Sequence, residues 1–174
     1  MQSPYPSSER CQERMKNILD IHNLAKKVKE LKEQRVTVVA TSGGFDPIHV
    51  GHIACLADSA HLFSNSVLIA IVNGDGFLVR KKGKPFMVHQ ERMGVVSAIR
   101  YVDFVTGWDD GSQTVCGALE ILKPDMFTKG GDRSARAVVP EAEICDRIGC
   151  TIVYGVGGTE KLQSSSDLIK GLVK

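Results

Sequence analysis

The stretch "TSGGFDPIHVGHI", Thr41 to Ile53, follows directly on the apolar run "VTVVA" and decides how this chain is expected to fold. Ser42, Gly43 and Gly44 allow a turn in which the backbone comes close to a ligand, because glycine has no Cβ in the way. The residues after the turn begin a helix, and free amides and the helix dipole favour an anion at its amino end. A strand, a glycine turn and a helix in this order predict an α/β unit with a phosphate site at the turn.

Short β-branched runs alternate with helix-length stretches along the rest of the chain. The runs are continuous rather than alternating, which is typical of strands covered on both faces. The alternation predicts an α/β fold, a doubly wound sheet of five parallel strands with right-handed crossovers. Ligands of such sheets bind at the carboxyl ends of the strands. Strands are expected at 35–41, 66–72, 102–107, 125–129 and 150–156, and helices at about 50–61, 89–99, 113–122, 138–148 and 165–172.

The first 34 residues precede this alternation. Residues 1–15 begin with a segment rich in Pro and Ser and are expected to be a disordered tail, so that residues 16–174 form one domain. Asp20 is a suitable N-cap, and apolar residues then recur at spacings of three and four, which predicts an N-terminal amphipathic helix. We favour packing of this helix on the domain's own sheet, with a partner helix as the alternative. The apolar positions are Ile21, Leu24, Val28 and Leu31.

Composition limits the partners. The chain has 174 residues and a formal net charge of +2. This net charge is too small to indicate a nucleic acid or a membrane as a partner. We find no run of 18 apolar residues and no apolar signal core at the start, and we expect a cytoplasmic protein. The five cysteines form no CxxC pair and are expected to be reduced thiols, mostly buried. We expect a homodimer.

His49 and His52 lie three positions apart and therefore on one side of the first helical turn. Two imidazole donors that converge on an anion would stabilise the negative charge that builds on a phosphoryl group in a transition state. The alternatives are two helix-capping histidines or part of a metal site. A metal site lacks a third ligand at a recognisable spacing, so we predict phosphate chemistry and no metal bound by the protein alone.

The segment "GGFDPIHVGH" resembles the (H/T)xGH signature of the cytidylyltransferase-like nucleotidyltransferases. Members of that family have a Rossmann-like fold, join a nucleoside triphosphate to a phosphate-bearing acceptor and release pyrophosphate. Within the family the chain looks most like the adenylyltransferase domain of ADP-heptose synthase, from about Lys16 to Lys174. The segments "VNGD", "ERM", "LKPDMFTKGGD" and "SSSDLI" occur in matching order. Glycerol-3-phosphate cytidylyltransferases share the first motif and "RYVD", and pyridine-nucleotide and pantetheine adenylyltransferases share GxFDPxHxGH.

Two basic features follow the second strand. The segment from Arg80 to Pro85 sets four basic groups in what we expect to be a loop, where a polyanion is the natural partner. The resemblance implies that Lys82, or Lys84 in its place, contacts phosphate. A solvated lysine loop is the alternative. Arg92 matches a family arginine that helps to hold the phosphates, although an ordinary surface arginine paired with a carboxylate would also fit this position.

Two later segments resemble nucleotide-binding parts of the family. Lys129, Gly130 and Asp132 follow the fourth strand, where backbone groups can read the edge of a base; a plain turn is the alternative. Three serines, Ser164, Ser165 and Ser166, open the last helix, where one should cap the helix and the others can hold the β and γ phosphates.

The predicted reaction is in-line attack by an acceptor phosphate oxygen on the α-phosphorus of the nucleotide, without a covalent intermediate. AMP transfer from ATP to a sugar or polyol phosphate is favoured, and Mg²⁺ is expected to be bound mainly through the nucleotide phosphates. A CTP-dependent enzyme for a phosphoalcohol and a non-catalytic nucleotide-binding protein are the alternatives. The predicted catalytic residues are His49, His52 and Lys82; the nucleotide-binding residues are Ser42, Gly43, Gly44, Phe45, Arg92, Lys129, Gly130, Asp132, Ser164, Ser165 and Ser166; the substrate-binding residues are Asp46, Asn73, Asp75 and Lys84.

Overall fold

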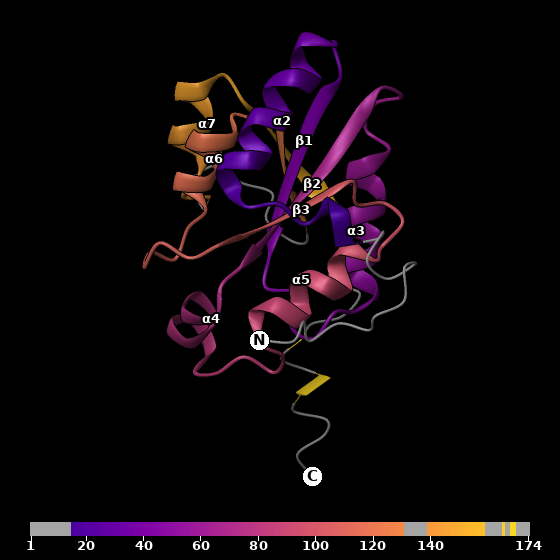
Figure 1. Ribbon diagram of the computed structural model, residues 1–174. Helices are drawn as coiled ribbons and strands as arrows, with labels where there is room; N and C mark the ends of the chain where they lie inside the picture. The colour runs from indigo at the N-terminus through magenta and orange to yellow at the C-terminus, as the bar shows by residue number, and fades with distance from the viewer. Residues whose placement is uncertain (1–14, 131–138, 159–164, 166–167, 170–174) are drawn as a thin grey trace.

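The computed structural model describes residues 15–130, 139–158, 165, 168 and 169, and every structural statement below concerns those residues. Five parallel strands form one sheet in the order β3-β2-β1-β4-β5 (Figure 1). The chain adds β2 and β3 on one side of β1 and then places β4 and β5 on the other, so the strand order reverses between β1 and β4. The strands are β1 (Thr37–Gly43), β2 (Ser66–Asn73), β3 (Phe104–Trp108), β4 (Met126–Gly130) and β5 (Thr151–Val156).

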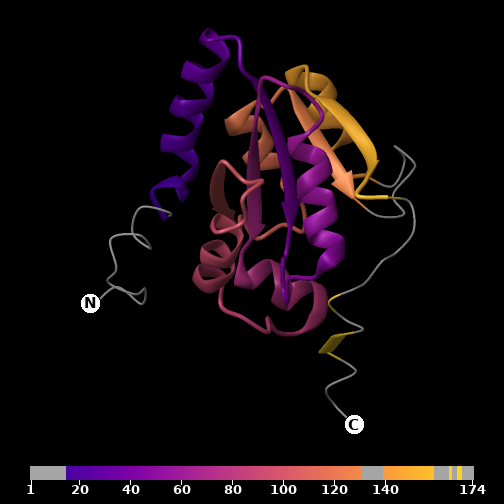
Figure 2. The same ribbon diagram turned by 90° about the vertical axis from the view of Figure 1, so that its right-hand side faces the viewer.

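Helices cover both faces of the sheet, as predicted (Figure 2). One face carries α2, α6 and α7, whose apolar side chains share a core with Phe127 of β4. The other face carries α3 and α5, where Leu56 and Val96 pack against β1 and β2. The helices are the short 3-10 helix η1 (Met15–Asn17), α2 (Ile21–Glu33), α3 (Val50–Ala60), α4 (Asp75–Lys82), α5 (His89–Ser97), α6 (Cys116–Leu122) and α7 (Ala142–Ile148).

The N-terminal helix α2 packs on the domain's own sheet. The Asp20 side chain accepts hydrogen bonds from the backbone amides of His22 and Asn23, at 3.1 and 3.0 Å, and so caps the helix. Leu24 and Val28 are buried in the core shared with α6 and α7. This burial uses the apolar stripe that a partner helix would otherwise need.

The sequence prediction was wrong for the segment 75–82. We expected Arg80, Lys81 and Lys82 in a loop, but they form the last turn of α4, which ends at Gly83 with φ 92°. The segment "DGFLVRKK" has no apolar stripe of helical period, so periodicity gave no signal for a helix. Basic residues in a last turn are favourable because they face the negative end of the helix dipole.

The other predicted elements are present with small shifts in their ends. The helices expected from residues 113 and 138 begin later, at Cys116 and Ala142. The helix expected at 165–172 lies mostly outside the described residues. Among the described cysteines all four are free thiols, with Cys145 and Cys150 buried. None of the described helices combines the length and the apolar character that crossing a bilayer would require.

Candidate active site

A cavity of about 550 Å³ opens at the carboxyl edge of the sheet, where the strand order reverses between β1 and β4. Such a switch point is where open α/β sheets bind ligands. The cavity passes over the edge of the sheet, from α3 on one face to the start of α6 and α7 on the other. The predicted site residues in its lining are Ser42, Gly43, Gly44, Phe45, His49, His52, Asn73, Lys129 and Gly130.

His49 and His52 are brought together by the start of α3. His49 is the N-cap residue of the helix, with extended backbone, and its carbonyl accepts a hydrogen bond from His52 N at 2.9 Å. The two imidazole rings stack with their centroids 3.8 Å apart and an interplanar angle of 27°. The ring of Phe45 lies 5.1 Å from that of His52 and closes the other side of the pair.

Burial favours the neutral form of both histidines. Desolvation lowers the pKa of His52 to about 4, with smaller contributions from the charges of His49 and Lys82. Desolvation also lowers the pKa of His49. The Nδ1 atoms of both rings are buried and have no hydrogen-bond partner among the described residues. A buried polar atom without a partner is uncommon, so the pair has hydrogen-bonding capacity that the fold itself does not use.

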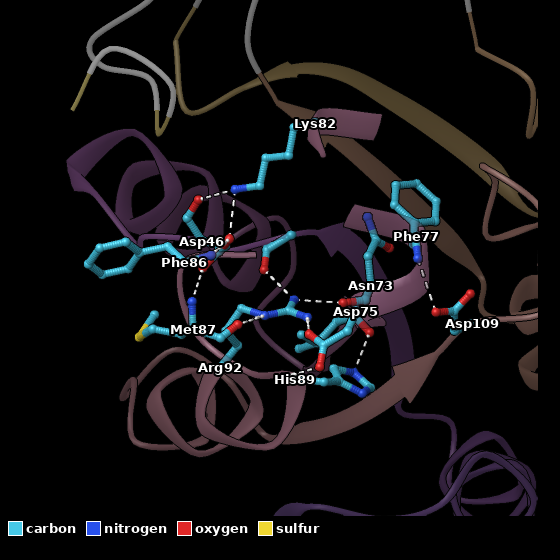
Figure 3. Close-up of polar contacts among 12 residues, drawn as sticks. Asp46, Asn73, Asp75, Phe77, Lys82, Phe86, Met87, His89, Arg92 and Asp109 are labelled. Atoms are coloured by element: carbon cyan, nitrogen blue, oxygen red, sulfur yellow. Dashed lines mark hydrogen bonds and ion pairs between the residues drawn. The ribbon is translucent and has the colours of Figure 1, made fainter. Parts of the chain in front are cut away.

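Asp46 holds the turn between β1 and α3 (Figure 3). Its side chain is 1% exposed and accepts hydrogen bonds from Phe86 N and Met87 N, at 2.7 and 2.8 Å. Lys82 Nζ donates to Asp46 Oδ2 at 2.7 Å and to its carbonyl oxygen at 2.8 Å. Burial raises the pKa of the Asp46 carboxyl, but the hydrogen bonds from Lys82 and the two amides outweigh burial and lower it. Asp46 is therefore ionised and holds the turn between β1 and α3 in place through these hydrogen bonds.

The bracing supports a strained residue. Phe45 has φ 49°, in the left-handed region that costs a residue with a Cβ about 1–2 kcal/mol. Its ring is buried against His52, and Asp46 beside it is fixed by four hydrogen bonds. The contacts therefore offset the cost and keep the turn in one conformation.

Arg92 is fully buried and ties three segments together (Figure 3). Its Nη1 donates to Gly44 O at 2.7 Å and to Asn73 O at 2.6 Å, at the ends of β1 and β2. Its Nε donates to Met87 O at 3.0 Å, and its Nη2 pairs with Asp75 Oδ1 at 2.8 Å. The guanidinium therefore sets the spacing of the strand ends rather than facing the cavity.

Several predicted site residues lie away from the cavity lining. Lys82, Arg92, Asp46 and Asp75 belong to the bracing network beside it, and Lys84 is exposed. Ser165 Oγ donates to Pro47 O at 2.9 Å, which places the described part of the last helix against the turn. Asp132, Ser164 and Ser166 lie outside the described residues.

The far side of the cavity holds residues that the sequence did not single out. Glu141 and Gln113 lie there with Lys129, and Cys55 and Phe77 lie elsewhere in the lining. Gly157 is also present, with φ 85°, and a Cβ there would lie 2.7 Å from Cys55 N, so the chain after β5 approaches α3 as only glycine can. Lys81 also lines the cavity, although the sequence indicated it only as one of the four basic residues between Arg80 and Pro85. Nothing in the sequence singled out Glu141, which lies within the helix expected at 138–148.

The described residues offer no set of protein metal ligands. They contain no cluster of three or more His, Cys, Asp or Glu side chains close enough to share an ion. Asp46, the carboxylate nearest to the histidines in sequence, already has Lys82 and two amides as partners.

A histidine pair and a glycine turn at the switch point of a parallel sheet match the class of nucleotidyltransferase folds. The chain belongs to the Cytidylyltransferase-like family, whose model matches residues 40–167.

Curated relatives and one solved structure agree with this assignment. The chain is 40% identical over 123 residues to the bifunctional protein HldE of Hahella chejuensis, which covers 70% of this chain and 23% of the relative. It is 30% identical over 169 residues to HldE of Syntrophotalea carbinolica, which covers 96% of this chain and 29% of the relative. The chain therefore spans less than a third of these relatives. A lipopolysaccharide core biosynthesis protein from Thermoplasma volcanium is similar in structure, with a TM-score of 0.56, 26% identity and coverage of 71% of this chain and 98% of that one.

Proposed function

We propose that this protein transfers a nucleotidyl group, with AMP favoured, from a nucleoside triphosphate to the phosphate of a sugar or polyol phosphate such as a heptose 1-phosphate. Pyrophosphate is the second product. The observation that carries the proposal is the stacked, neutral pair of His49 and His52 in the cavity at the strand-order reversal. The similarity to the bifunctional protein HldE supports a sugar phosphate as the acceptor.

In the proposed reaction an acceptor phosphate oxygen attacks the α-phosphorus as the bond to the β-phosphate oxygen breaks. A neutral imidazole suits this role because its N–H can be donated to a phosphoryl oxygen. As negative charge grows on that oxygen, the hydrogen bonds strengthen and lower the barrier. The amides of the turn at Gly43 and Gly44 add further donors. Lys82, which lies close enough to lower the pKa of His52, supplies positive charge beside them.

Mg²⁺ is proposed as a cofactor that is bound mainly through the nucleotide phosphates. It would neutralise phosphate charge when bound.

The nucleotide is proposed to be ATP rather than CTP. The segment "LKPDMFTKGGD" looks like the adenylyl branch of the family, and backbone around Gly130, which lines the cavity, would contact the edge of the base. A site whose polar groups form hydrogen bonds with the edge of adenine leaves those groups unpaired when cytosine is bound. We therefore expect ATP to be preferred over CTP by about tenfold or more. A CTP-dependent enzyme for a phosphoalcohol is the alternative.

One assay tests the proposal. Each of the four nucleoside triphosphates is incubated with Mg²⁺ and a panel of phosphosugars and phosphoalcohols, and pyrophosphate is measured. We expect release with ATP and a phosphosugar that is lost in His52→Ala. Preference for CTP with glycerol 3-phosphate would assign the protein to the cytidylyl branch. Tight nucleotide binding without pyrophosphate from any pair would make it a non-catalytic binding protein.

A further inference from the structure

The side of the cavity opposite the histidines holds a buried ion pair. Lys129 Nζ lies 3.2 Å from Glu141 Oε2, and their side chains are 9% and 5% exposed. The ammonium also lies 4.6 Å from the centroid of the Phe127 ring. Removing two opposite charges from water costs several kcal/mol per ion, and apolar residues of similar volume often serve stability as well or better. The pair therefore calls for a reason other than stability.

The surroundings of Glu141 point to an incomplete set of partners. Glu141 is the N-cap residue of α7, but its side chain makes no capping hydrogen bond to that helix. Instead Oε1 accepts a long hydrogen bond, 3.4 Å, from Val115 N. Oε2 accepts no hydrogen bond in the described part of the chain, although Lys129 lies beside it. A carboxylate oxygen can accept two hydrogen bonds, so Oε2, which is buried in a residue that lines the cavity, has acceptor capacity that the described residues do not fill.

We infer that Lys129 and Glu141 form a hydroxyl-binding subsite for the polyol part of a substrate. This inference rests on the proposed function, because it assumes that the phosphates lie at the histidine side of the cavity. A hydroxyl group both donates and accepts, so adjacent hydroxyls can donate to the carboxylate and accept from the ammonium. A phosphate would be repelled by Glu141 and is better placed at the neutral histidines and the helix end.

Two sources could supply these hydroxyls, namely the acceptor sugar and the ribose of the nucleotide. The test compares Glu141→Gln, which keeps the size of the side chain but removes its charge, with Glu143→Gln, an exposed glutamate on the same helix. Calorimetric titration with ATP, 2′-deoxy-ATP and 3′-deoxy-ATP probes the ribose without requiring turnover. The KM for the acceptor found in the pyrophosphate assay probes the sugar.

We expect Glu141→Gln to weaken one of the two ligands by about tenfold or more, as for a lost hydrogen bond to a charged group, while Glu143→Gln changes neither. If the ribose is bound there, the loss for ATP is absent for the deoxynucleotide that lacks the hydroxyl in question. If the acceptor is bound there, its KM rises, and analogues that lack one hydroxyl are less sensitive to the variant.

The double variant Lys129→Met with Glu141→Leu covers the case in which Glu141→Gln disturbs folding. Apolar replacement of both charges should preserve the fold and still abolish the preference for hydroxyl-bearing ligands. Unchanged ATP affinity and unchanged acceptor KM in both variants would overturn the inference, as would an altered ratio of ATP to CTP use, which would assign the pair to the base. Failure of the wild type to release pyrophosphate would overturn the proposed function alone, since the ATP titration would then decide the subsite.

Discussion

Two polar clusters at the carboxyl edge of the sheet differ in how completely their hydrogen bonds are satisfied. Around Arg92 and Asp46 the donors meet carbonyls and carboxylates at 2.6 to 3.0 Å (Figure 3). Around His49 and His52 the rings stack on each other, and both Nδ1 atoms lack partners in the described structure. The first cluster lies outside the cavity lining, and the second lies within it.

This difference distinguishes residues that hold the fold in place from residues that are free to bind a ligand. A satisfied buried network fixes geometry but has no free capacity for a ligand, whereas an unsatisfied one costs stability and is retained where a ligand completes it. We call Arg92 with Asp46, Asp75 and Lys82 the bracing cluster. Substitutions in this cluster should therefore mainly lower the free energy of unfolding. The histidine pair should respond mainly through turnover.

Replacement of Arg92 should have the largest effect on stability. Arg92→Met removes the cation that pairs with Asp75 and leaves three carbonyls without their donor. We expect the free energy of unfolding to fall by about 3 kcal/mol or more, because each buried carbonyl left without a donor costs about 1–3 kcal/mol. Urea denaturation followed by circular dichroism would measure it.

The matched control is Arg147→Met, which breaks the exposed pair of Arg147 with Glu120. Exposed pairs contribute about 0–1 kcal/mol, so this variant should denature close to the wild type. Equal, small losses in both variants would mean that Arg92 is not an architectural clamp.

His52→Ala should produce the reverse pattern. If His52 stabilises the transition state, kcat should fall by about 10² or more, which is about 2.7 kcal/mol, as for loss of one oxyanion donor. Thermal stability should change much less than turnover, because the lost contacts with Phe45 are offset in part by removal of a buried nitrogen that has no partner among the described residues. His61→Ala, at the exposed end of the same helix, should keep wild-type turnover. Normal turnover in His52→Ala would contradict the mechanism.

The fold could be predicted from the sequence because its signals are local. Short, mostly apolar runs indicated all five strands, and the apolar stripe from Ile21 indicated α2. The glycine turn beside the HxGH motif predicted where the cavity lies, because a glycine turn before a helix is a common site for binding an anion. By contrast α4 has no stripe, because it lies at the edge of the domain and buries only Phe77 and Leu78.

The parts of the site that could not be predicted depend on tertiary contacts. A charged residue in the first turns of a helix is ordinarily exposed, so nothing local indicates that Arg92 is buried against the carbonyls at two strand ends. Glu141 meets Lys129 only because α7 begins beside the end of β4, and that juxtaposition spans a segment without periodic pattern. Sequence order alone does not state which charges will meet across a cavity.

The two clusters should also titrate in different pH ranges. The pKa of His52 is about 4 in the folded protein and 6.5 as its ordinary value, so between these values the unfolded chain binds a proton that the folded chain does not. Stability should therefore be complete above about pH 6.5 and fall as the pH is lowered towards 4, by at most about 1.4 kcal/mol per pH unit for one group. Asp46, whose pKa is lowered from 3.8, should lose its contribution only below that range.

Chemical denaturation from pH 8 to pH 4 checks this expectation. His52→Gln should flatten the dependence between pH 6.5 and 4, and Asp46→Asn should leave its slope in that interval while lowering stability throughout. A slope unaffected by His52→Gln would show that the pH dependence comes from other groups.

Lys82 joins the two clusters, and its replacement should give the smallest but most discriminating effect. Its ammonium fills two acceptors of Asp46 and also lowers the pKa of His52, so it lies within electrostatic reach of both. Lys82→Ala should cost about 1 kcal/mol of stability, because Asp46 keeps its two backbone amides. If phosphate also interacts with this charge, KM for the nucleoside triphosphate should rise by about tenfold, or 1.4 kcal/mol.

Lys26→Ala, on the exposed side of α2, should change neither quantity. A loss of stability with unchanged KM would assign Lys82 to the bracing cluster alone, and the division between architecture and chemistry would then run between Lys82 and the histidines.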